Sequence, residues 1–506
     1  MAQPLDVLFI NPGDRKQLYQ NLGDGMSAIE PPIYSAMFAD YMRRKGYSVA
    51  IYDTPAMSGP AEHAARAAVE DYKARLIVIP VYGFQPSAST QNMSSAGKIA
   101  KLIKEASPAQ KILITGTHPA ALPKRTLMEE AVDYVCDGEG PITIEAVVEA
   151  LKGSGDVSRA PALWRIEDGE VIPPQAAAPL ITDLDGTMPL PAWDLLPMDR
   201  YRAHNWHCFD HIDQRQPYAS LYTTLGCPFK CNFCCINAPF GKPSYRMWSP
   251  ETVVAMIGNL VKNYGVKNIK FVDEMFVLNK RHVEAICDGI IANGYDVNIW
   301  AYARVDTAYP ELLDKMRAAG INWLALGIES ASDFVRDGAE KSLNDSEIVQ
   351  AVRRVEDAGI HVLGNYIFGL PDDTLESMQR TLDMALELKS AFINFYSAMA
   401  YPGSQLYTEA VSKGAKLPEQ WHHFSQHAYD TLPLANDQLS AGEILAFRDY
   451  AFDRYFHDQG YLSMVEKRFG TNVLDHIKEM RAMTLPRKLL DEDPSLMANL
   501  RARDNA

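Results

Sequence analysis

The residues best suited to chemistry are three cysteines close together near the middle of the chain. Cys227, Cys231 and Cys234 have the spacing C-x3-C-x2-C. Three thiolates this close can lie on one loop and bind one face of a soft metal centre, either zinc or a cubane iron–sulfur cluster. Structural zinc normally takes four protein ligands in two separated pairs, and the chain has no second C-x2-C pair. A cubane cluster held by three cysteines leaves one iron open for chemistry.

The segments around the cysteines alternate between strand-like and helical patterns. Helical patterns such as Pro250–Asn263, Lys280–Asn293 and Asp345–Asp357 separate the strand-like runs. Six strand–helix units in a row predict a partial parallel barrel, in which function lies at the C-terminal strand ends. The predicted strands are Ser220–Thr223, Ile269–Val272, Val297–Ala303, Leu324–Ile328, Val362–Phe368 and Ile393–Ser397.

Polar residues and a glycine stand at the ends of these predicted strands. They are Asp273 and Glu274, Arg304, Glu329 and Ser330, and Gly369. Carboxylates at a barrel mouth can accept hydrogen bonds from an ammonium group or from ribose hydroxyls. Taken singly, each residue fits a capping or salt-bridge role equally well. Their arrival at successive strand ends behind one cysteine triplet favours a shared ligand site.

The first third of the chain shows a second alternation, which predicts a doubly wound parallel sheet. Its strands are Asp6–Ile10, Ser48–Tyr52, Leu76–Val81, Lys111–Thr115 and Asp133–Cys136. Ligands on such sheets bind beyond the carboxyl ends of the strands, and glycines there let the backbone approach a bulky ligand. No G-x-G-x-x-G follows the first strand, so a dinucleotide is disfavoured. The candidate ligand residues are Asn11, Tyr82, Gly83, Gly116, Thr117, His118, Gly138 and Glu139.

The cysteine spacing, with Phe233 just before the last cysteine, resembles the signature of the radical S-adenosylmethionine (SAM) superfamily. The resemblance implies a [4Fe–4S] cluster on Cys227, Cys231 and Cys234. Its open iron binds the amino and carboxylate groups of SAM, and an electron from the reduced cluster cleaves SAM to a 5′-deoxyadenosyl radical. An external electron donor such as flavodoxin or ferredoxin is implied as a partner.

The same resemblance gives the strand-end residues roles toward SAM. Asp273 and Glu274 match the second-strand acidic motif that contacts the SAM amino group, and which of the two makes the contact is left open. The sequence GIES resembles the fourth-strand motif at the ribose and carboxylate, which implicates Glu329 and Ser330. Arg304 can pair with the SAM carboxylate. The sequence IFGLP, with Gly369, resembles the stretch that passes the adenine.

The segments TGTHPAALP and VDYVCDGEG resemble the cobalamin-binding domain fused to many radical SAM enzymes. The D-x-H-x-x-G motif that supplies a lower axial histidine is missing. The resemblance therefore implies cobalamin bound without a histidine on cobalt. His118 is interpreted first as a polar loop residue packed against Pro119. The alternative for the whole domain is a sheet that has lost its cofactor and only recognises substrate.

Four regions are expected: a cobalamin-binding domain over residues 1–153, a proline-rich linker over 154–217, the barrel over 218–413 and a mostly helical region over 414–506. The linker should form a small hairpin with Asp168 and Gly169 at its turn. Its histidines can ligate a metal if helical, but the proline-rich context favours an interdomain loop. The histidines of QWHHFSQHAY either contact substrate or, as we favour, are solvated helix residues. These are His204, His207 and His211 in the linker, and His422, His423 and His427.

The composition limits the class of protein. With 506 residues, 47% hydrophobic and 22% charged, the chain is globular. A net charge of −15 disfavours nucleic acid as a partner, and no apolar run is long enough to cross a membrane. The first residues carry no basic segment or cleavage-like site, so no signal peptide is expected. Seven cysteines, three of them clustered, indicate a reducing compartment, and we expect a cytoplasmic protein.

By the resemblance, the expected activity is cobalamin-dependent methyl transfer to an unactivated carbon of a small molecule. Some relatives instead perform oxidative ring closure or rearrangement, as anaerobic porphyrin ring cyclases do. A tRNA methylthiotransferase is disfavoured because those enzymes carry a second cysteine triplet, whereas Cys136 is alone in the first third. A cobalamin or iron–sulfur sensor without turnover is disfavoured by the number of polar groups at the barrel mouth.

Overall fold

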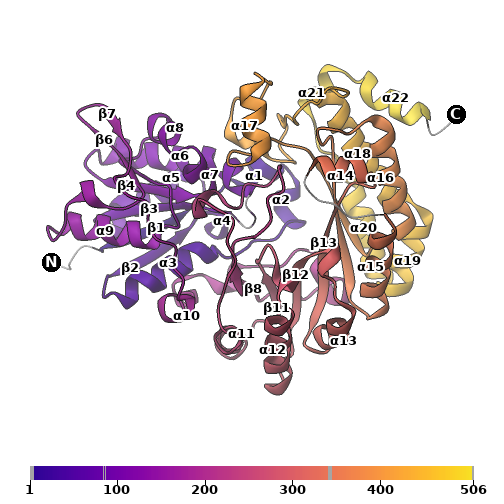
Figure 1. The fold of residues 1–506 in the computed structure, drawn as a ribbon, viewed down its shortest axis with the longest axis horizontal. Helices are drawn as coiled ribbons and strands as arrows, with labels where there is room; N and C mark the ends of the chain where they lie inside the picture. The colour runs from indigo at the N-terminus through magenta and orange to yellow at the C-terminus, as the bar shows by residue number, and fades with distance from the viewer. Residues whose placement is uncertain (1–4, 84, 86, 340–344, 504–506) are drawn as a thin grey trace.

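The computed structural model describes residues 5–83, 85, 87–339 and 345–503. Two large sheets lie next to each other, and a helical region lies beyond the second sheet (Figure 1). The chain passes through them in order, from the first sheet in indigo to the helices in yellow. None of the helices in the described ranges is both long enough and apolar enough to cross a membrane.

The first sheet has seven strands in the order β2-β1-β3-β4-β5-β6-β7, and its first five are parallel. They are almost fully buried, as expected for strands covered by helices on both faces. Helices that connect the strands of this sheet include α3 (Ile33–Arg44), α5 (Ala61–Arg66), α6 (Ala88–Ala106) and, between β5 and β6, α9 (Pro141–Leu151). The parallel strands are β1 (Val7–Asn11), β2 (Val49–Asp53), β3 (Leu76–Val81), β4 (Lys111–Gly116) and β5 (Tyr134–Cys136).

The predicted hairpin around Asp168 and Gly169 forms, but it belongs to the first sheet. Its strands β6 (Leu163–Glu167) and β7 (Glu170–Ile172) are antiparallel, and β6 pairs with β5. Figure 1 shows both strands at the outer edge of this sheet. The chain therefore completes the sheet after residue 153 and only then enters the connecting segment.

The second sheet has six parallel strands in the order β15-β14-β13-β12-β11-β8, which confirms the predicted partial (β/α)6 barrel. The helices that connect its strands include α11 (Pro250–Tyr264), α12 (Lys280–Ala292), α13 (Pro310–Ala318), α15 (Asp345–Asp357) and α16 (Leu375–Leu388). The strands are β8 (Tyr218–Leu221), β11 (Asn268–Phe271), β12 (Asn298–Arg304), β13 (Ile321–Glu329), β14 (His361–Phe368) and β15 (Phe392–Ser397).

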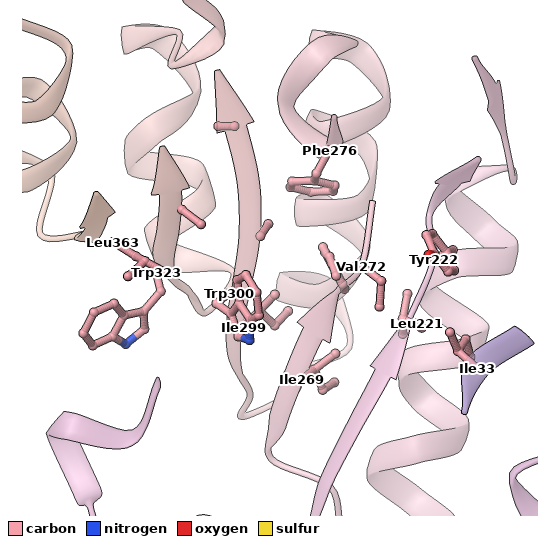
Figure 2. Packing of buried hydrophobic residues seen from close by; sticks show 14 of the residues in the cluster. Ile33, Leu221, Tyr222, Ile269, Val272, Phe276, Ile299, Trp300, Trp323 and Leu363 are labelled. Atoms are coloured by element: carbon pink, nitrogen blue, oxygen red, sulfur yellow. The ribbon is translucent and has the colours of Figure 1, made fainter. Parts of the chain in front are cut away.

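One hydrophobic core cluster extends across both sheets. Figure 2 shows its members on neighbouring strands of the second sheet, with Ile33 from the start of α3 beside Leu221. Trp300 and Trp323, on β12 and β13, are almost fully buried. Because apolar side chains of both regions share this core, separating the two sheets would expose a large apolar surface to water.

The linker segment with the three histidines closes the N-terminal ends of the barrel strands. Its short 3₁₀ helix η5 (Trp206–His211) places the Trp206 ring 5.1 Å from Trp300 and 5.4 Å from Trp323. His207 bonds the Asn298 carbonyl at the start of β12, and His361 at the start of β14 bonds Asp210. His207 therefore links this interdomain segment to the start of a barrel strand. Among the described residues, no group of potential metal ligands close to one another includes the three linker histidines.

The last region packs helices against the far edge of the second sheet, where α18 contacts β15 and α22 contacts α18. Figure 1 shows these helices in orange and yellow on that side of the molecule. Helix α18 begins with a capping box between Ser440 and Glu443. The helices of this region are α18 (Ala441–His457), α19 (Gln459–Phe469), α20 (Thr471–Ala482), α21 (Lys488–Glu492) and α22 (Ser495–Arg503). Helix α17 (Gln405–Ser412) precedes them and lies near the first region (Figure 1), where Leu406 packs in a small apolar cluster with Leu122.

Candidate active site

A cavity of about 510 Å³ runs inside the curved second sheet. All three regions of the chain contribute to its wall, and much of the wall is aromatic. The charged or titratable residues in the wall include Glu30, Lys270, Glu274, Arg304, Glu329, His427 and Arg448, together with the cysteines of the loop. A mainly apolar cavity with few charged groups is typical of a small-molecule site.

The cysteine loop opens into this cavity. Short strands β9 (Thr224–Leu225) and β10 (Arg246–Met247) pair and close the base of the loop. Cys227, Cys231 and Cys234 form no disulfide bond and are partly exposed, and all three line the cavity. Burial raises the pKa of Cys227 to about 11 and that of Cys234 well above its usual value. Such thiols become thiolates readily only when a metal takes them as ligands.

The spacing of the three sulfur atoms bears on which metal they suit. Among the described residues, one group of His, Cys, Asp or Glu has ligand atoms all within 4.8 Å, namely His422, His423 and Asp430. The three Sγ atoms are therefore spread more widely than that. Sulfurs on one tetrahedral zinc lie only about 3.8 Å apart, given Zn–S bonds of about 2.3 Å. The donor set and its spread suit a cluster of several irons better than a single zinc.

Two adjacent carboxylates at the end of β11 have different surroundings. Asp273 is fully buried and accepts hydrogen bonds from Thr223 and Thr224, so it fixes the entry to the cysteine loop. Glu274 lines the cavity, and its Oε2 is buried without a hydrogen-bond partner among the described residues. Burial raises the pKa of Glu274 to about 8. Without a cationic ligand, this carboxyl group is therefore mostly protonated at neutral pH. A cationic ligand group would favour its ionised form and could pair with it.

Arg304 and Glu329 also face the cavity. The Arg304 guanidinium makes two 2.9 Å bonds to Asp306 and lies 4.2 Å from the Phe229 ring centroid in the cysteine loop. Glu329 ends β13 with a backbone φ of +66°, a conformation that residues other than glycine rarely adopt. Strain of this kind clusters at functional sites. Phe233 lines the same cavity from the loop.

Ser330 and Gly369 lie next to the cavity but not in its wall. The Ser330 hydroxyl is buried against Thr381, and the Ser330 backbone carbonyl accepts a hydrogen bond from the Arg336 guanidinium. Gly369 has a φ of +83°, and its N–H donates to Asp373. A Cβ there would lie 2.6 Å from Ile444, so the glycine is required by packing. Leu370, one residue further, reaches the cavity wall.

A second cavity of about 90 Å³ lies at the carboxyl ends of β1 and β3 and shares Tyr19, Ser27, Glu30, His204 and Val272 with the large one. Asn11, Tyr82 and Gly83 line it. The Tyr82 ring stacks on Tyr34 with centroids 3.7 Å apart. The space beside this sheet therefore adjoins the space inside the barrel.

The other five residues predicted to contact cobalamin line neither cavity. A Cβ on Gly116 would lie 2.2 Å from the Val81 carbonyl oxygen, so that glycine permits close strand packing. Thr117 begins the short helix α7 (Thr117–Ala121) and is buried. His118 is buried between Thr90 and Trp421, and burial lowers its pKa to about 3. Glu139, after Gly138, pairs with Arg246 at 2.6 Å, across the interface with the cysteine-loop hairpin.

Several cavity residues were not singled out from the sequence. Lys270, on β11, is buried and pairs at 3.0 Å with Glu30, which also lies 3.5 Å from His204. Lys270 of β11 and, beyond the end of that strand, Val272 and Glu274 all line the cavity, and this spacing of two residues was the available signal. Asn365 and Asn394 bond each other on β14 and β15. Arg448 comes from the last region, where no local pattern marks it.

The C-terminal histidines do not lie on a solvated helix. His422 bonds Ser94 of α6, and His423 lies 3.7 Å from Asp430. His427 lines the cavity and contacts the Tyr19 ring. Tertiary contacts between regions far apart in sequence determine these positions, and a local pattern of polar residues does not reveal them.

Comparison with known proteins relates both halves of the chain to described families. Residues 221–385 match the family model of the radical SAM superfamily, and residues 26–148 match that of the B12 binding domain. The chain is 32% identical over 342 residues to an uncharacterized methyltransferase of Pyrococcus horikoshii, covering 67% of this chain and 71% of that protein. It is 24% identical over 463 residues to the anaerobic magnesium-protoporphyrin IX monomethyl ester cyclase of Rubrivivax gelatinosus, covering 90% and 78%.

The fold is similar to that of the radical S-adenosylmethionine methyltransferase TsrM of Kitasatospora setae, solved with cobalamin and a [4Fe–4S] cluster. The TM-score is 0.71 at 15% sequence identity, and the match covers 94% of this chain and all of that one. At this identity the likeness concerns the fold.

Proposed function

The chain belongs to the radical SAM enzymes that carry a B12-binding domain, and on this premise we propose that it is a cobalamin-dependent methyltransferase. Its proposed reaction moves a methyl group from SAM to an unactivated carbon of a small molecule. One observation carries the proposal. Three partly exposed cysteines and the unsatisfied Glu274 carboxylate share a cavity that adjoins the carboxyl end of the first sheet.

The cysteine loop and the strand ends provide the proposed site for the cluster and SAM. Cys227, Cys231 and Cys234 hold the cluster through soft sulfur donors. Glu274 accepts from the SAM ammonium group, because its neighbour Asp273 is already used by two threonines. Glu329 faces the ribose, and Arg304 pairs with the SAM carboxylate. Ser330 and Gly369 support these groups from behind the wall.

Cobalamin is proposed to lie where the two cavities adjoin. Asn11, Tyr82 and Gly83 face that space, whereas His118 is occupied by Thr90 and Trp421. This arrangement supports binding without an axial ligand from His118. Gly116, Thr117, Gly138 and Glu139 are assigned to shaping the sheet edge and the interface rather than to direct contact. When bound, the cluster with SAM supplies a 5′-deoxyadenosyl radical, and cobalamin supplies the methyl group.

The chain's own contribution is to position the substrate and exclude water. The segment with Trp206 closes the strand starts, and aromatic side chains form much of the wall, so a radical inside is shielded from solvent. The cluster is proposed to receive its electron from a separate small redox protein such as flavodoxin or ferredoxin.

The test is anaerobic reconstitution with cluster, SAM, cobalamin and a reductant. Methyl transfer predicts two products in the presence of substrate, 5′-deoxyadenosine and S-adenosylhomocysteine. Reconstituted protein that cleaves no SAM would overturn the proposal.

Oxidative cyclisation is the second candidate, because the match to the magnesium-protoporphyrin cyclase covers 90% of this chain, against 67% for the methyltransferase relative. Cyclisation predicts 5′-deoxyadenosine without stoichiometric S-adenosylhomocysteine. The same assay therefore separates the two reactions.

A further inference from the structure

The wall that the last region contributes to the large cavity contains an excess of buried positive charge. Arg448 of α18 is 6% exposed and faces the cavity, and Arg487 behind it is 2% exposed. Asp449 bonds both, at 2.7 Å to Arg448 and at 2.9 Å to Arg487. Two guanidinium groups thus share one carboxylate. Burying a charge without full compensation is costly, so this arrangement favours an additional anion.

Arg448 retains hydrogen-bonding capacity toward the cavity. Its Nε donates to the Phe395 carbonyl at 2.9 Å, and its Nη1 donates to Asp449. Within the described ranges, Nη2 donates to no acceptor. Arginine presents its donors in a planar fork that matches carboxylate and phosphate oxygens.

His427 provides a second polar group next to this wall. It lines the cavity, and its Nδ1 is buried with no hydrogen-bond partner in the described part of the chain. Burial and the nearby arginine charges keep its pKa well below the usual value, so the ring is neutral. A neutral imidazole can donate one hydrogen bond to an oxyanion.

The position of these groups is fixed from three directions. Arg487 Nη1 donates to the carbonyls of Gln426 and Ala428, and Gln20 from the first region donates to the His427 carbonyl. The Gln426 side chain bonds both backbone groups of Ser397 at the end of β15. Such a network gives a site that is formed before any ligand arrives.

We propose that Arg448 and His427 form a subsite for an oxyanion of the substrate, so that the substrate is an organic anion with an apolar body. The inference rests on the proposed function and names the substrate class. Phe395, Tyr396 and Phe452 line the cavity beside Arg448 and suit the apolar part of such a molecule. The charged group is a carboxylate or a phosphate, and both match the donors.

The test uses three naphthalene probes that share one ring system. These are 1-naphthaleneacetate, 1-naphthyl phosphate and the neutral 1-naphthaleneethanol. Their binding to full-length reconstituted protein is measured by calorimetry, with saturating SAM to fill its own site and without reductant. A charge-assisted hydrogen bond predicts that at least one anion binds about tenfold more tightly than the neutral probe. The preferred anion distinguishes a carboxylate from a phosphate site.

Arg448→Gln should reduce this preference to about twofold or less, since only the charge-assisted contact is lost. Arg448→Lys should keep part of it, and Arg454→Gln, on the exposed side of the same helix, should keep all of it. Equal affinity for the three probes in the unmodified protein would overturn the proposal, as would an unchanged preference in Arg448→Gln. If Arg448→Gln fails to fold, the preference for the anionic probes in the unmodified protein and in Arg448→Lys still tests the proposal.

Substrate-independent SAM cleavage separates this inference from the proposed function. With reductant and without substrate, the unmodified protein and Arg454→Gln should both release 5′-deoxyadenosine, because Arg454 belongs to none of the proposed sites. Absence of cleavage in the unmodified protein would count against the proposed function, whereas normal cleavage without anion preference would count against the subsite alone.

Discussion

Asp273 and Glu274 show how two neighbouring residues of the same chemical type acquire different roles. Asp273 is satisfied by the loop threonines, so replacing it with asparagine should disturb the entry to the cysteine loop. Glu274 has an unsatisfied oxygen in the cavity. Glu274→Gln should therefore weaken SAM binding by about tenfold or more, because one charge-assisted hydrogen bond is lost. The melting temperature of the variant should stay within a few degrees of that of the unmodified protein. Calorimetric titration of SAM into reconstituted protein measures the SAM binding, and weaker binding in Asp273→Asn only would reverse the assignment.

The four cysteines around the loop permit an internal control. Cys231→Ala removes one of the three proposed ligands and should abolish both cluster retention and SAM cleavage. Cys235 follows Cys234 directly and has no place in the C-x3-C-x2-C triplet, so it should not bind the cluster. Cys235→Ala should therefore keep the iron content and the 5′-deoxyadenosine yield of the unmodified protein. Iron and sulfide analysis after anaerobic reconstitution checks both variants, and equal loss in both would mean that the ligand set is wrong.

Sequence patterns place residues at strand ends but do not tell which way their side chains turn. The cysteines, Glu274, Arg304 and Glu329 all reach the cavity, as their positions after predicted strands suggest. Ser330 has the same kind of position, yet its hydroxyl turns back to Thr381. Arg448 reaches the cavity from a helix more than a hundred residues away from the cysteine loop in sequence, so only the packed structure brings it there.

At the scale of elements, strand and helix positions follow closely from hydrophobic periodicity. All six strands of the second sheet overlap the predicted runs, because buried parallel strands are continuous apolar segments. The sequence predicted the β6–β7 hairpin but not its pairing with strand β5 of the first sheet. Pairing between β5 and β6 depends on an open edge of the first sheet, and nothing in the hairpin's own sequence specifies that edge.

The ends of β1 and β2 are joined by a buried carboxyl group that should make stability depend on pH. Asp53 accepts from Asn11 at 2.7 Å and from Tyr201 at 2.8 Å, and burial raises its pKa to about 6. Its pKa in the unfolded chain is about 3.9, so the native state keeps this proton between about pH 4 and 6 while the unfolded state loses it. Stability from this group is therefore present at low pH and lost as pH rises through 6.

The change in unfolding free energy from Asp53 should total about 3 kcal/mol, at about 1.4 kcal/mol for each of two pKa units. Asp53→Asn should remove that part of the slope, because the amide does not titrate. Urea unfolding of both proteins between pH 4 and 7 measures the difference. An identical slope in the two proteins would show that Asp53 ionises in the native state as it does in water.

At the scale of the whole molecule, the first region and the barrel are joined by a buried ion pair in the wall of the large cavity. Glu30 lies just before α3, and Lys270 lies on β11, with both side chains no more than 4% exposed. Removing one partner of a buried pair leaves an uncompensated charge and typically costs about 3–5 kcal/mol. Lys270→Met should therefore lower the free energy of unfolding by about that amount, whereas Lys270→Met combined with Glu30→Met should recover much of the loss.

His204 makes the effect of Lys270→Met depend on pH. Its Nε2 lies 3.5 Å from Glu30, and burial together with the Lys270 charge lowers its pKa in the unmodified protein. Without Lys270, an unpaired Glu30 carboxylate should raise the His204 pKa, so that the imidazolium can take the place of the ammonium group. A raised histidine pKa adds stability below the unfolded pKa of about 6.5 and loses it as pH rises. The loss of unfolding free energy caused by Lys270→Met should thus be smaller at pH 5.5 than at pH 8, as measured by urea unfolding. Adding His204→Gln should abolish that difference between the two pH values. A loss that does not change with pH would mean that Glu30 takes up a proton itself or finds another cation.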